Sequence, residues 1–249
     1  MGTRLTLACI LAAGAGVRLG EAGQEQPKGF LRLGDRPIVV ESIERLQRAG
    51  IERIVIVTGH RSEFYDALAG PDITLVHNPR YSEAGSLWSL CCARDALPDD
   101  FLLLESDIVY EQRALEALQE SPHPDAVLVS GFTASGDEVY VAARDGRLVG
   151  MSKRREDFAP AEVRGEMVGL CRISVEFYAH IRATAEHLFC HDLHGSYETA
   201  GLTACAHQVQ VSCPLISDLL WAEIDDLSHL QRAQERTYPA IVAREQQGI

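Results

Sequence analysis

The 249-residue sequence contains little positive charge and almost no lysine. Lysine and arginine together number 23, against 36 aspartate and glutamate residues, which gives a formal net charge of -13. Only Lys28 and Lys153 are lysines. A general surface for nucleic acid or for anionic lipid needs a basic field, so this charge argues against both kinds of partner. Any anion that the protein binds must therefore be held by a local group of cations.

Long hydrophobic runs and paired cysteines are missing as well. The apolar stretch from Leu5 to Ala13 is too short to span a membrane, and no signal-peptide cleavage pattern follows it. The seven cysteines include no CxxC pair and are odd in number, which argues against a disulfide framework or a zinc knuckle. We therefore expect a cytoplasmic protein with reduced thiols. Its oligomeric state is open at this point, with a homodimer as one option.

Strand and helix patterns alternate through the first half of the chain. Continuous apolar runs typical of buried strands cover residues 5–11, 54–58, 73–76 and 101–104. Helical spacing covers residues 37–49, 62–68, 86–96 and 112–119. Because buried strands alternate with helices, we predict an α/β fold with a mainly parallel sheet and helices on both faces.

After Pro124 the pattern changes to short strands separated by turn-forming residues. Strand patterns at 126–130, 139–143 and 148–152 predict a small antiparallel β insertion over about residues 125–170. Further on, the sequence predicts helices at 175–189, around 198–207 and at 227–237, and a short strand near 209–213. Since 46% of the residues are hydrophobic and no repeat or low-complexity linker is present, we expect residues 1–249 to form a single domain.

A glycine-rich turn follows the first strand pattern. The sequence there is Leu11-Ala12-Ala13-Gly14-Ala15-Gly16-Val17-Arg18-Leu19-Gly20, with Pro27-Lys28 shortly after. Small residues let backbone N–H groups approach a triphosphate, and Arg18 and Lys28 supply positive charge. A dinucleotide fingerprint would need glycine at position 19, and a Walker A loop would need Gly-Lys-Ser/Thr, so neither common motif fits. Glycines also occur in ordinary strand-to-helix turns, but in a chain that otherwise uses arginine, Lys28 and Lys153 are candidates for phosphate contacts.

Carboxylates follow two of the extended segments. Glu105-Ser106-Asp107 stands at the carboxyl end of the strand pattern 101–104, which is the edge where α/β sheets bind ligands. In Trp221-Ala222-Glu223-Ile224-Asp225-Asp226, alternation places Glu223 and Asp225 on one face of an extended segment. Either could join Asp107 in binding a hard cation. A helix N-cap before residue 227 would account for Asp225 or Asp226, but not for both.

These motifs together resemble those of the sugar-phosphate nucleotidyltransferases, with LAAGxGxR and PK at 11–28, ESD at 105–107 and WxEID at 221–225. Two further stretches, His77-Asn78-Pro79-Arg80-Tyr81 and Gly85-Ser86-Leu87-Trp88-Ser89-Leu90, resemble the cytidylyltransferase branch that acts on phosphocholine or 2-aminoethylphosphonate. The resemblance covers nearly the whole chain. It implies a Rossmann-like mixed sheet and a reaction in which CMP passes from CTP to a small phosphonate or phosphate acceptor, with Mg²⁺ as cofactor and pyrophosphate as the second product.

The resemblance also implies a role for individual residues. Arg18 and Lys28 would contact the triphosphate and Lys153 the acceptor phosphate, so these three are the catalytic candidates. The nucleotide would lie against Leu11, Ala12, Ala13, Gly14, Ala15, Gly16 and Ser86. The Mg²⁺ ligands would be Asp107, Asp225 and Glu223. Glu105 departs from the family pattern, since many relatives have glycine or asparagine there, and so does Gly29-Phe30 after Lys28.

The acceptor is defined less sharply by the sequence. A trimethylammonium group favours an aromatic cage, whereas a primary ammonium favours carboxylates. The acceptor-binding candidates are Glu105, Lys153, Tyr197, Glu198 and Trp221. Because aromatic residues make up only 6% of the chain, 2-aminoethylphosphonate is the preferred acceptor, phosphocholine the alternative, and a sugar or inositol phosphate a third reading. A regulatory protein that binds a nucleotide without turning it over is the alternative that is not an enzyme. Such a protein would be indicated by the loss of a metal-binding carboxylate or of a lysine, and all of these residues are present.

Overall fold

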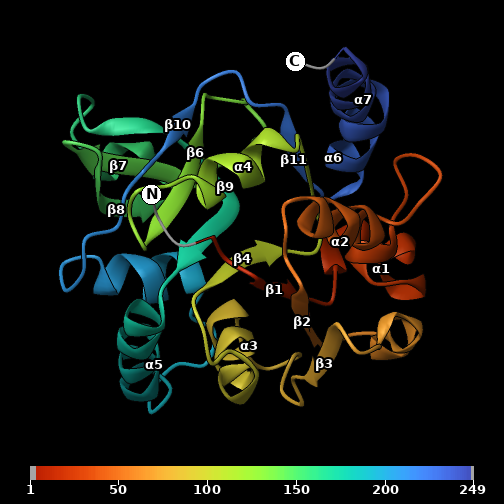
Figure 1. Ribbon diagram of the computed structural model, residues 1–249, viewed down its shortest axis with the longest axis horizontal. Coiled ribbons are helices and arrows are strands. Elements are labelled where there is room, and N and C mark those ends of the chain that lie inside the picture. Colours follow the sequence, from red (N-terminus) through yellow and green to blue (C-terminus); the bar gives the residue numbers. More distant parts are fainter. Residues whose placement is uncertain (1–3, 248–249) are drawn as a thin grey trace.

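The computed structural model describes residues 4–247, and a central β-sheet with helices on both sides dominates it (Figure 1). The strands are β1 (Leu7–Ala12), β2 (Arg53–Thr58), β3 (Ile73–His77), β4 (Phe101–Glu105), β5 (Ile108–Tyr110), β6 (Ala126–Ser130), β7 (Tyr140–Arg144), β8 (Arg147–Ser152), β9 (Val163–Ile173), β10 (Leu215–Ile216) and β11 (Trp221–Glu223). The main sheet has the order β10-β6-β9-β4-β1-β2-β3, with β7 and β8 attached beside β9. Strands β11 and β5 form a separate antiparallel pair.

Helices occupy most of the segments where helical spacing predicts them. The α-helices are α1 (Glu21–Glu25), α2 (Ile38–Arg48), α3 (Ser86–Cys92), α4 (Arg113–Gln119), α5 (Val175–Leu188), α6 (Leu227–Arg232) and α7 (Tyr238–Gln246). The predicted helix at Ser62–Leu68 is a 3₁₀ helix, and the one predicted around 198–207 is a π-helical segment at Tyr197–Thr203. The prediction of a mixed, mainly parallel sheet flanked by helices is confirmed.

One central strand runs against the others. Strand β9 is antiparallel to both of its neighbours, β4 and β6, whereas β1 is parallel to β2 and to β4. Strands β7 and β8 pair antiparallel with each other and β7 pairs antiparallel with β9, as expected for the β-rich stretch after Pro124. The sequence does not predict β9 because Glu166 and Arg172, both buried, interrupt its apolar pattern.

The strand predicted near residues 209–213 is wrong. Only Ser212 forms β-bridges there, one with Ala126 and one with Arg147. Its backbone bonds go alternately to two different partners: Ser212 N–H donates to Asp125, whereas Cys213 N–H donates to Gly146. A segment that divides its hydrogen bonds in this way forms no continuous ladder.

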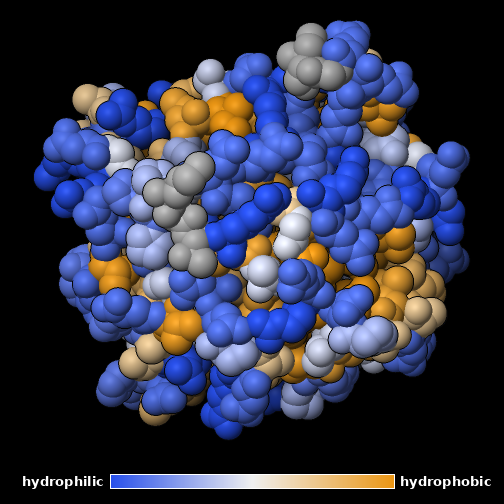
Figure 2. Space-filling view, in the orientation of Figure 1, coloured by the Kyte–Doolittle hydropathy of each residue, from blue (hydrophilic) through white to orange (hydrophobic). Residues whose placement is uncertain are grey.

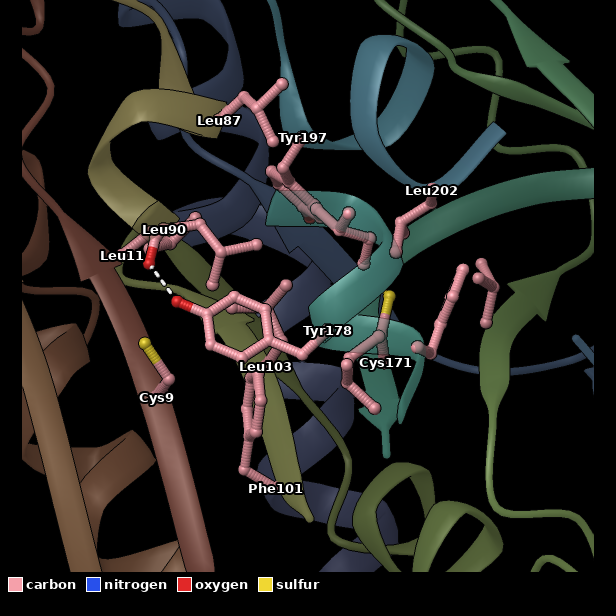
Figure 3. Close-up of a cluster of buried hydrophobic side chains, with 14 of the residues drawn as sticks. Cys9, Leu11, Leu87, Leu90, Phe101, Leu103, Cys171, Tyr178, Tyr197 and Leu202 are labelled. Atoms are coloured by element: carbon pink, nitrogen blue, oxygen red, sulfur yellow. Dashed lines mark hydrogen bonds between the residues drawn. The ribbon is translucent and has the colours of Figure 1, made fainter. Parts of the chain in front are cut away.

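The core lies on both faces of the sheet, because alternate residues of a strand point to opposite sides. In β1, Leu7, Cys9 and Leu11 pack with α3 and α5, and the alternate residues pack with α2 and α4. Figure 3 shows the first of these clusters, where the Tyr178 hydroxyl donates to the Leu90 carbonyl at 2.7 Å and so joins α5 to α3. A smaller third cluster joins β5 and β11 to the C-terminal helices α6 and α7.

The face of the molecule seen in Figure 2 is largely hydrophilic, with hydrophobic residues in separate groups. Within residues 4–247, none of the helices combines the length and the apolar character needed to cross a membrane.

Candidate functional site

Backbone hydrogen bonds bring the three motif segments together at the carboxyl ends of β1 and β4. The Ser106 N–H donates to the Leu11 carbonyl at 3.0 Å, which ties the ESD segment to the start of the glycine-rich loop. The Ile224 N–H donates to the Asp107 carbonyl at 3.0 Å, and β11 pairs with β5 just before it. Residues far apart in the chain therefore meet at one edge of the sheet, the edge where α/β folds bind ligands.

A cavity of about 150 Å³ opens at this edge. Five of the seven residues expected to contact a nucleotide line it, namely Leu11, Ala12, Ala13, Gly14 and Ser86. Ala15 and Gly16 lie outside its lining and form the turn instead, where Gly16 has φ 60° and so takes a conformation that glycine adopts without strain. The remaining lining residues are Lys28, Tyr81, Ala84, Gly85, Ser89, Glu105, Ser106 and Asp107.

The wall of this cavity at the start of α3 is held in place by hydrogen bonds with residues 193–197. The Gly85 N–H donates to the Leu193 carbonyl at 2.7 Å, and the Ser86 hydroxyl accepts from the Tyr197 N–H at 3.0 Å. A Cβ on Gly85 would lie 2.4 Å from the Gly195 carbonyl oxygen, so only glycine fits there. The sequence predicts no individual role for Gly85 or Ser89, although both belong to the stretch that carries the cytidylyltransferase resemblance.

Lys28 connects two of the expected metal ligands. Its Nζ donates to Asp107 Oδ2 at 2.6 Å and to Asp225 Oδ1 at 2.7 Å. Burial alone would lower the pKa of Lys28, but the carboxylates of Asp107 and Asp225 outweigh burial and raise that pKa well above its usual value. Lys28 is therefore a permanently charged ammonium that neutralises two buried carboxylates.

The other two predicted cations meet at one carboxylate that the sequence did not single out. Arg18 forms an ion pair with Asp225 at 2.9 Å and another with Asp137 at 2.6 Å. Lys153 pairs with the second oxygen of Asp137 at 2.5 Å. Partial burial would raise the pKa of Asp137, but Lys153 and Arg18 lower it to about 2. In the sequence, Ser135-Gly136-Asp137 indicates only a turn, so no signal there distinguished Asp137.

A group of three carboxylates could hold a metal ion. Oxygens of Glu105, Asp107 and Glu223 all lie within 4.8 Å of one another. Burial, followed by the neighbouring carboxylates, raises the pKa of both Glu105 and Glu223, because like charges here oppose ionisation. Carboxylate oxygens are the ligands that Mg²⁺ prefers, so these residues fit a hard divalent cation. Asp225 lies outside this group and pairs with Lys28 and Arg18.

Two of the acceptor candidates, Tyr197 and Glu198, are not among the residues that line the cavity just described. Tyr197 is fully buried in the core, and its hydroxyl donates to Glu105 Oε1 at 2.6 Å (its place in the core is seen in Figure 3). One oxygen of Glu198, Oε2, is buried without a hydrogen-bond partner. Both residues affect Glu105: Glu198 helps to raise its pKa, and the hydrogen bond from Tyr197 acts to lower it.

A second cavity, of about 280 Å³, lies on the other side of the acidic group. Trp221, Glu223 and Asp225 line it from β11 and the residues that follow, and Asp137 and Glu138 line it from the loop between β6 and β7. The two cavities are therefore separated by the charged residues described above. This arrangement provides room for two small molecules that meet at one set of charges.

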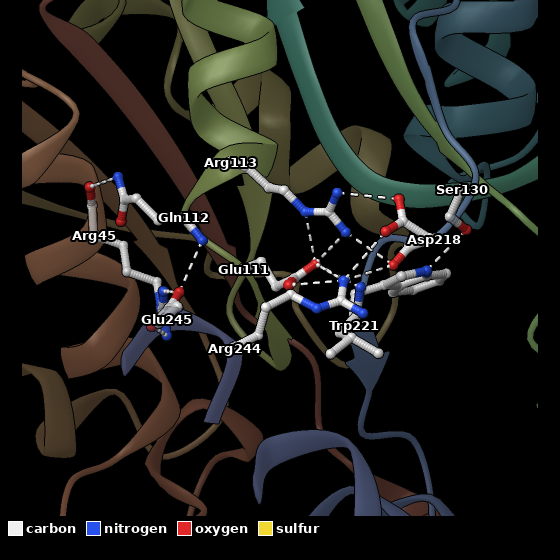
Figure 4. Close-up of polar contacts among 10 residues, drawn as sticks. Arg45, Glu111, Gln112, Arg113, Ser130, Asp218, Trp221, Arg244 and Glu245 are labelled. Atoms are coloured by element: carbon white, nitrogen blue, oxygen red, sulfur yellow. Dashed lines mark hydrogen bonds and ion pairs between the residues drawn. The ribbon is translucent and has the colours of Figure 1, made fainter. Parts of the chain in front are cut away.

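The β11 side of the second cavity is held by a polar network (Figure 4). Buried Glu111 pairs with Arg113 and with Arg244 of α7, and its Oε2 accepts from the Leu220 N–H at 2.8 Å. The indole N–H of Trp221 donates to the Ser130 hydroxyl at 2.8 Å. Asp226 caps α6 by accepting from the His229 N–H, so of the two neighbouring aspartates only Asp225 takes part in the site.

The chain belongs to the family of MobA-like NTP transferase domains, which it matches over residues 8–244. It is 32% identical to a CMP-5'-(3-aminopropyl)phosphonate synthase from Streptomyces rubellomurinus, over 97% of this chain and 40% of that protein. It is 29% identical to a 2-aminoethylphosphonate cytidylyltransferase from Lancefieldella rimae, over 61% of this chain and 63% of that protein. The chain thus spans less than two thirds of the length of either relative.

Solved structures agree on the fold. The inositol-1-phosphate CTP transferase of T. maritima superposes with a TM-score of 0.77 at 20% identity, over 95% of this chain and 99% of that one. This likeness, like the order of strands in the sheet, identifies a nucleotidyltransferase fold.

Proposed function

We propose that this protein is a cytidylyltransferase that transfers CMP from CTP to a small amino-phosphonate, with 2-aminoethylphosphonate as the first candidate, and releases pyrophosphate. The observation that carries the proposal is the pair of cavities on either side of the Lys28, Asp107 and Asp225 ion pairs. The similarity to cytidylyltransferases of phosphonates supports the choice of nucleotide and acceptor. We further propose that residues 1–249 act as one domain, in which the β-rich stretch 125–170 lies on the acceptor side.

In the proposed reaction, an oxygen of the acceptor phosphonate attacks the α-phosphorus of CTP in line with the bond to the β-phosphate. The new P–O bond forms as the α–β bond breaks, and pyrophosphate leaves with its negative charge. The acceptor oxygen is already anionic, so no strong general base is needed, and the work falls to alignment and charge neutralisation. Mg²⁺ bound at the carboxylate group Glu105, Asp107 and Glu223 would neutralise charge on the phosphates.

The cations of the chain have separate tasks in this proposal. Lys28 lines the first cavity and is assigned to the triphosphate, together with Arg18. Lys153 comes from the segment after β8 and is assigned to the acceptor phosphonate. The small residues Ala12, Ala13 and Gly14 allow the nucleotide to approach the backbone.

Phosphocholine is the alternative acceptor, because the second cavity also contains the aromatic side chains of Phe132 and Trp221. A trimethylammonium group would use these rings, whereas a primary ammonium would use the carboxylates of Asp137 and Glu138. Four carboxylates line this cavity, Asp137, Glu138, Glu223 and Asp225, and this favours the primary amine.

The test is pyrophosphate release with CTP and Mg²⁺, with 2-aminoethylphosphonate, phosphocholine and a sugar 1-phosphate supplied separately. We expect turnover with the phosphonate that is lost in Asp107→Ala and unchanged in Asp145→Asn. Asp145 is the matched control, because it is an exposed aspartate with φ 52° at the β7–β8 turn, a conformation that asparagine also tolerates. Turnover with a sugar phosphate and none with either cationic acceptor would contradict the acceptor assignment, and no turnover with any acceptor would contradict the proposed activity.

A further inference from the structure

The three cations assigned to phosphate groups are all held by carboxylates in a single row of alternating charge. Each neighbouring pair in the row is joined by an ion pair of 2.5 to 2.9 Å. From one end to the other, the row runs through Asp107, Lys28, Asp225, Arg18, Asp137 and Lys153. It has three positive and three negative members, so a bound phosphate or phosphonate has to compete with a carboxylate for each cation.

Asp137 differs from Asp107 and Asp225 in its partners, because those two pair with Lys28 whereas Asp137 pairs with Arg18 and Lys153. Like Asp225, it lies outside the three-carboxylate group that fits a metal ion and lines the second cavity. The loop that carries it is held after Asp137 by the Met167 N–H, which donates to the Val139 carbonyl at 2.8 Å, and before Asp137 by two further contacts. The Thr133 N–H and hydroxyl donate to buried Glu166, and Arg232 donates to the Ser135 carbonyl at 3.3 Å.

The two partners of Asp137 are far more exposed to solvent than Asp137 itself. The side chains of Arg18 and Lys153 are 56% and 62% exposed, but that of Asp137 is only 18% exposed. Long, exposed cationic side chains can turn toward an incoming anion at little cost. When they do, the carboxylate of Asp137 stays behind, partly buried and without its charged partners.

A partly buried carboxylate that has lost its charged partners is unfavourable, so another cation is needed to pair with it. The second cavity offers Asp137, Glu138, Glu223 and Asp225 as carboxylates, and Arg232 is the single lysine or arginine among its lining residues. An acceptor with an anionic group and an ammonium group on a short carbon chain supplies both charges at once. Its phosphonate replaces Asp137 as the partner of Lys153, while the triphosphate of CTP takes Arg18. Its ammonium then replaces Lys153 and Arg18 as the partner of Asp137.

We infer that Asp137 is the residue that selects an ammonium-bearing acceptor, by exchanging its ion pairs with Arg18 and Lys153 for one with the amine of the substrate. This inference depends on the proposed function, since it concerns the acceptor of that reaction. It assigns the amine to a carboxylate that also holds the phosphate-binding cations before the substrate arrives. Selection of the acceptor and release of the cations are then one event.

The experiment compares 2-aminoethylphosphonate with ethylphosphonate, which has the same carbon chain and no amine, in the wild type and in Asp137→Asn. We expect the ratio of kcat/KM for the two acceptors to fall at least about tenfold in the variant, equal to about 1.4 kcal/mol for a charge-assisted hydrogen bond. Any effect of the variant on Arg18 and Lys153 acts on both acceptors and cancels in the ratio. Asp145→Asn should leave the ratio unchanged, and Asp137→Glu, which keeps the charge, should keep most of the preference.

Calorimetric binding of the two phosphonates, with Mg²⁺ and a non-hydrolysable CTP analogue present, gives the same comparison when turnover on ethylphosphonate is too slow to measure. An unchanged ratio in Asp137→Asn, with both acceptors weakened equally, would overturn the assignment and leave Asp137 as a positioning residue for the cations. Absence of turnover by the wild type with either acceptor would overturn the proposed function and the role of Asp137 with it. These two failures are therefore distinguishable.

Discussion

Replacing Lys28 by methionine should destabilise the protein in the absence of metal. The methionine keeps an unbranched stem of similar size but removes the ammonium that neutralises Asp107 and Asp225. These carboxylates are only 8% and 7% exposed, so they would remain as buried charges without their cation. Breaking a buried ion pair by removing one partner costs about 3–5 kcal/mol.

The expected change in thermal stability follows from this cost. For a domain of about this size, 1 kcal/mol corresponds to about 2–4 °C in Tm. Because Arg18 still pairs with Asp225, we take the lower end of the cost, about 3 kcal/mol, and expect Tm to fall by about 6–12 °C. The measurement is calorimetry at pH 7.5 with EDTA.

The matched control is Lys153→Met, which removes the only other lysine. Its side chain is 62% exposed, so its ion pair with Asp137 should contribute no more than about 1 kcal/mol. Adding Mg²⁺ or Mn²⁺ should then raise the Tm of Lys28→Met by more than that of the wild type, because the metal no longer competes with an ammonium. A Tm within about 2 °C of the wild type in EDTA, or an equal gain from metal in both proteins, would refute the reasoning.

Two more substitutions test the two sides of the site. No atom lies within 4 Å of a Cβ built on Gly14, which lines the first cavity, so Gly14→Ala should leave Tm unchanged and raise the KM for CTP about tenfold; a normal KM would show that the nucleotide does not approach this position. Glu223→Gln removes a carboxyl group whose pKa is raised by burial and by neighbouring carboxylates. A raised pKa means that the stability contributed by this group is fully present below the unfolded pKa of about 4.3 and is lost as pH rises through the folded pKa. The variant should therefore have a Tm a few degrees above the wild type at pH 8 in EDTA but not at pH 4, and an equal difference at both values would contradict the assignment.

The parallel half of the fold could be predicted from the sequence because its strands are apolar on both faces. The run from Ile54 to Thr58 packs into two cores at once, and such a run has no other stable place in a protein of this size. Strand β9 is buried as well, but Glu166 and Arg172 satisfy their charges through contacts with distant parts of the chain. Those contacts are decided by tertiary structure, and no local pattern indicates them.

The candidate site likewise has residues that a local sequence pattern predicts and residues that only tertiary contacts bring into place. Ala13 and Gly14 were predictable because the sharp turn after the buried strand β1 requires small residues, which is a local demand. Asp137 was not, because its partners Arg18 and Lys153 meet it only after the glycine-rich loop and the β-rich stretch have packed together. The position of Tyr197 behind Glu105 likewise depends on a contact between residues 92 positions apart.

The ion pairs of Lys28 also have an order in which they can form during synthesis of the chain. Asp107 follows Lys28 by 79 residues, but Asp225 follows it by 197. At about 5–20 residues per second, the ribosome needs roughly 10–40 s to make the second partner after it has made the lysine. Until then, a growing chain can build the cavity between β1 and β4, but it lacks β11 and every carboxylate that β11 positions. A message cut short before residue 221 would therefore encode every residue that lines the first cavity but neither Glu223 nor Asp225 of the second.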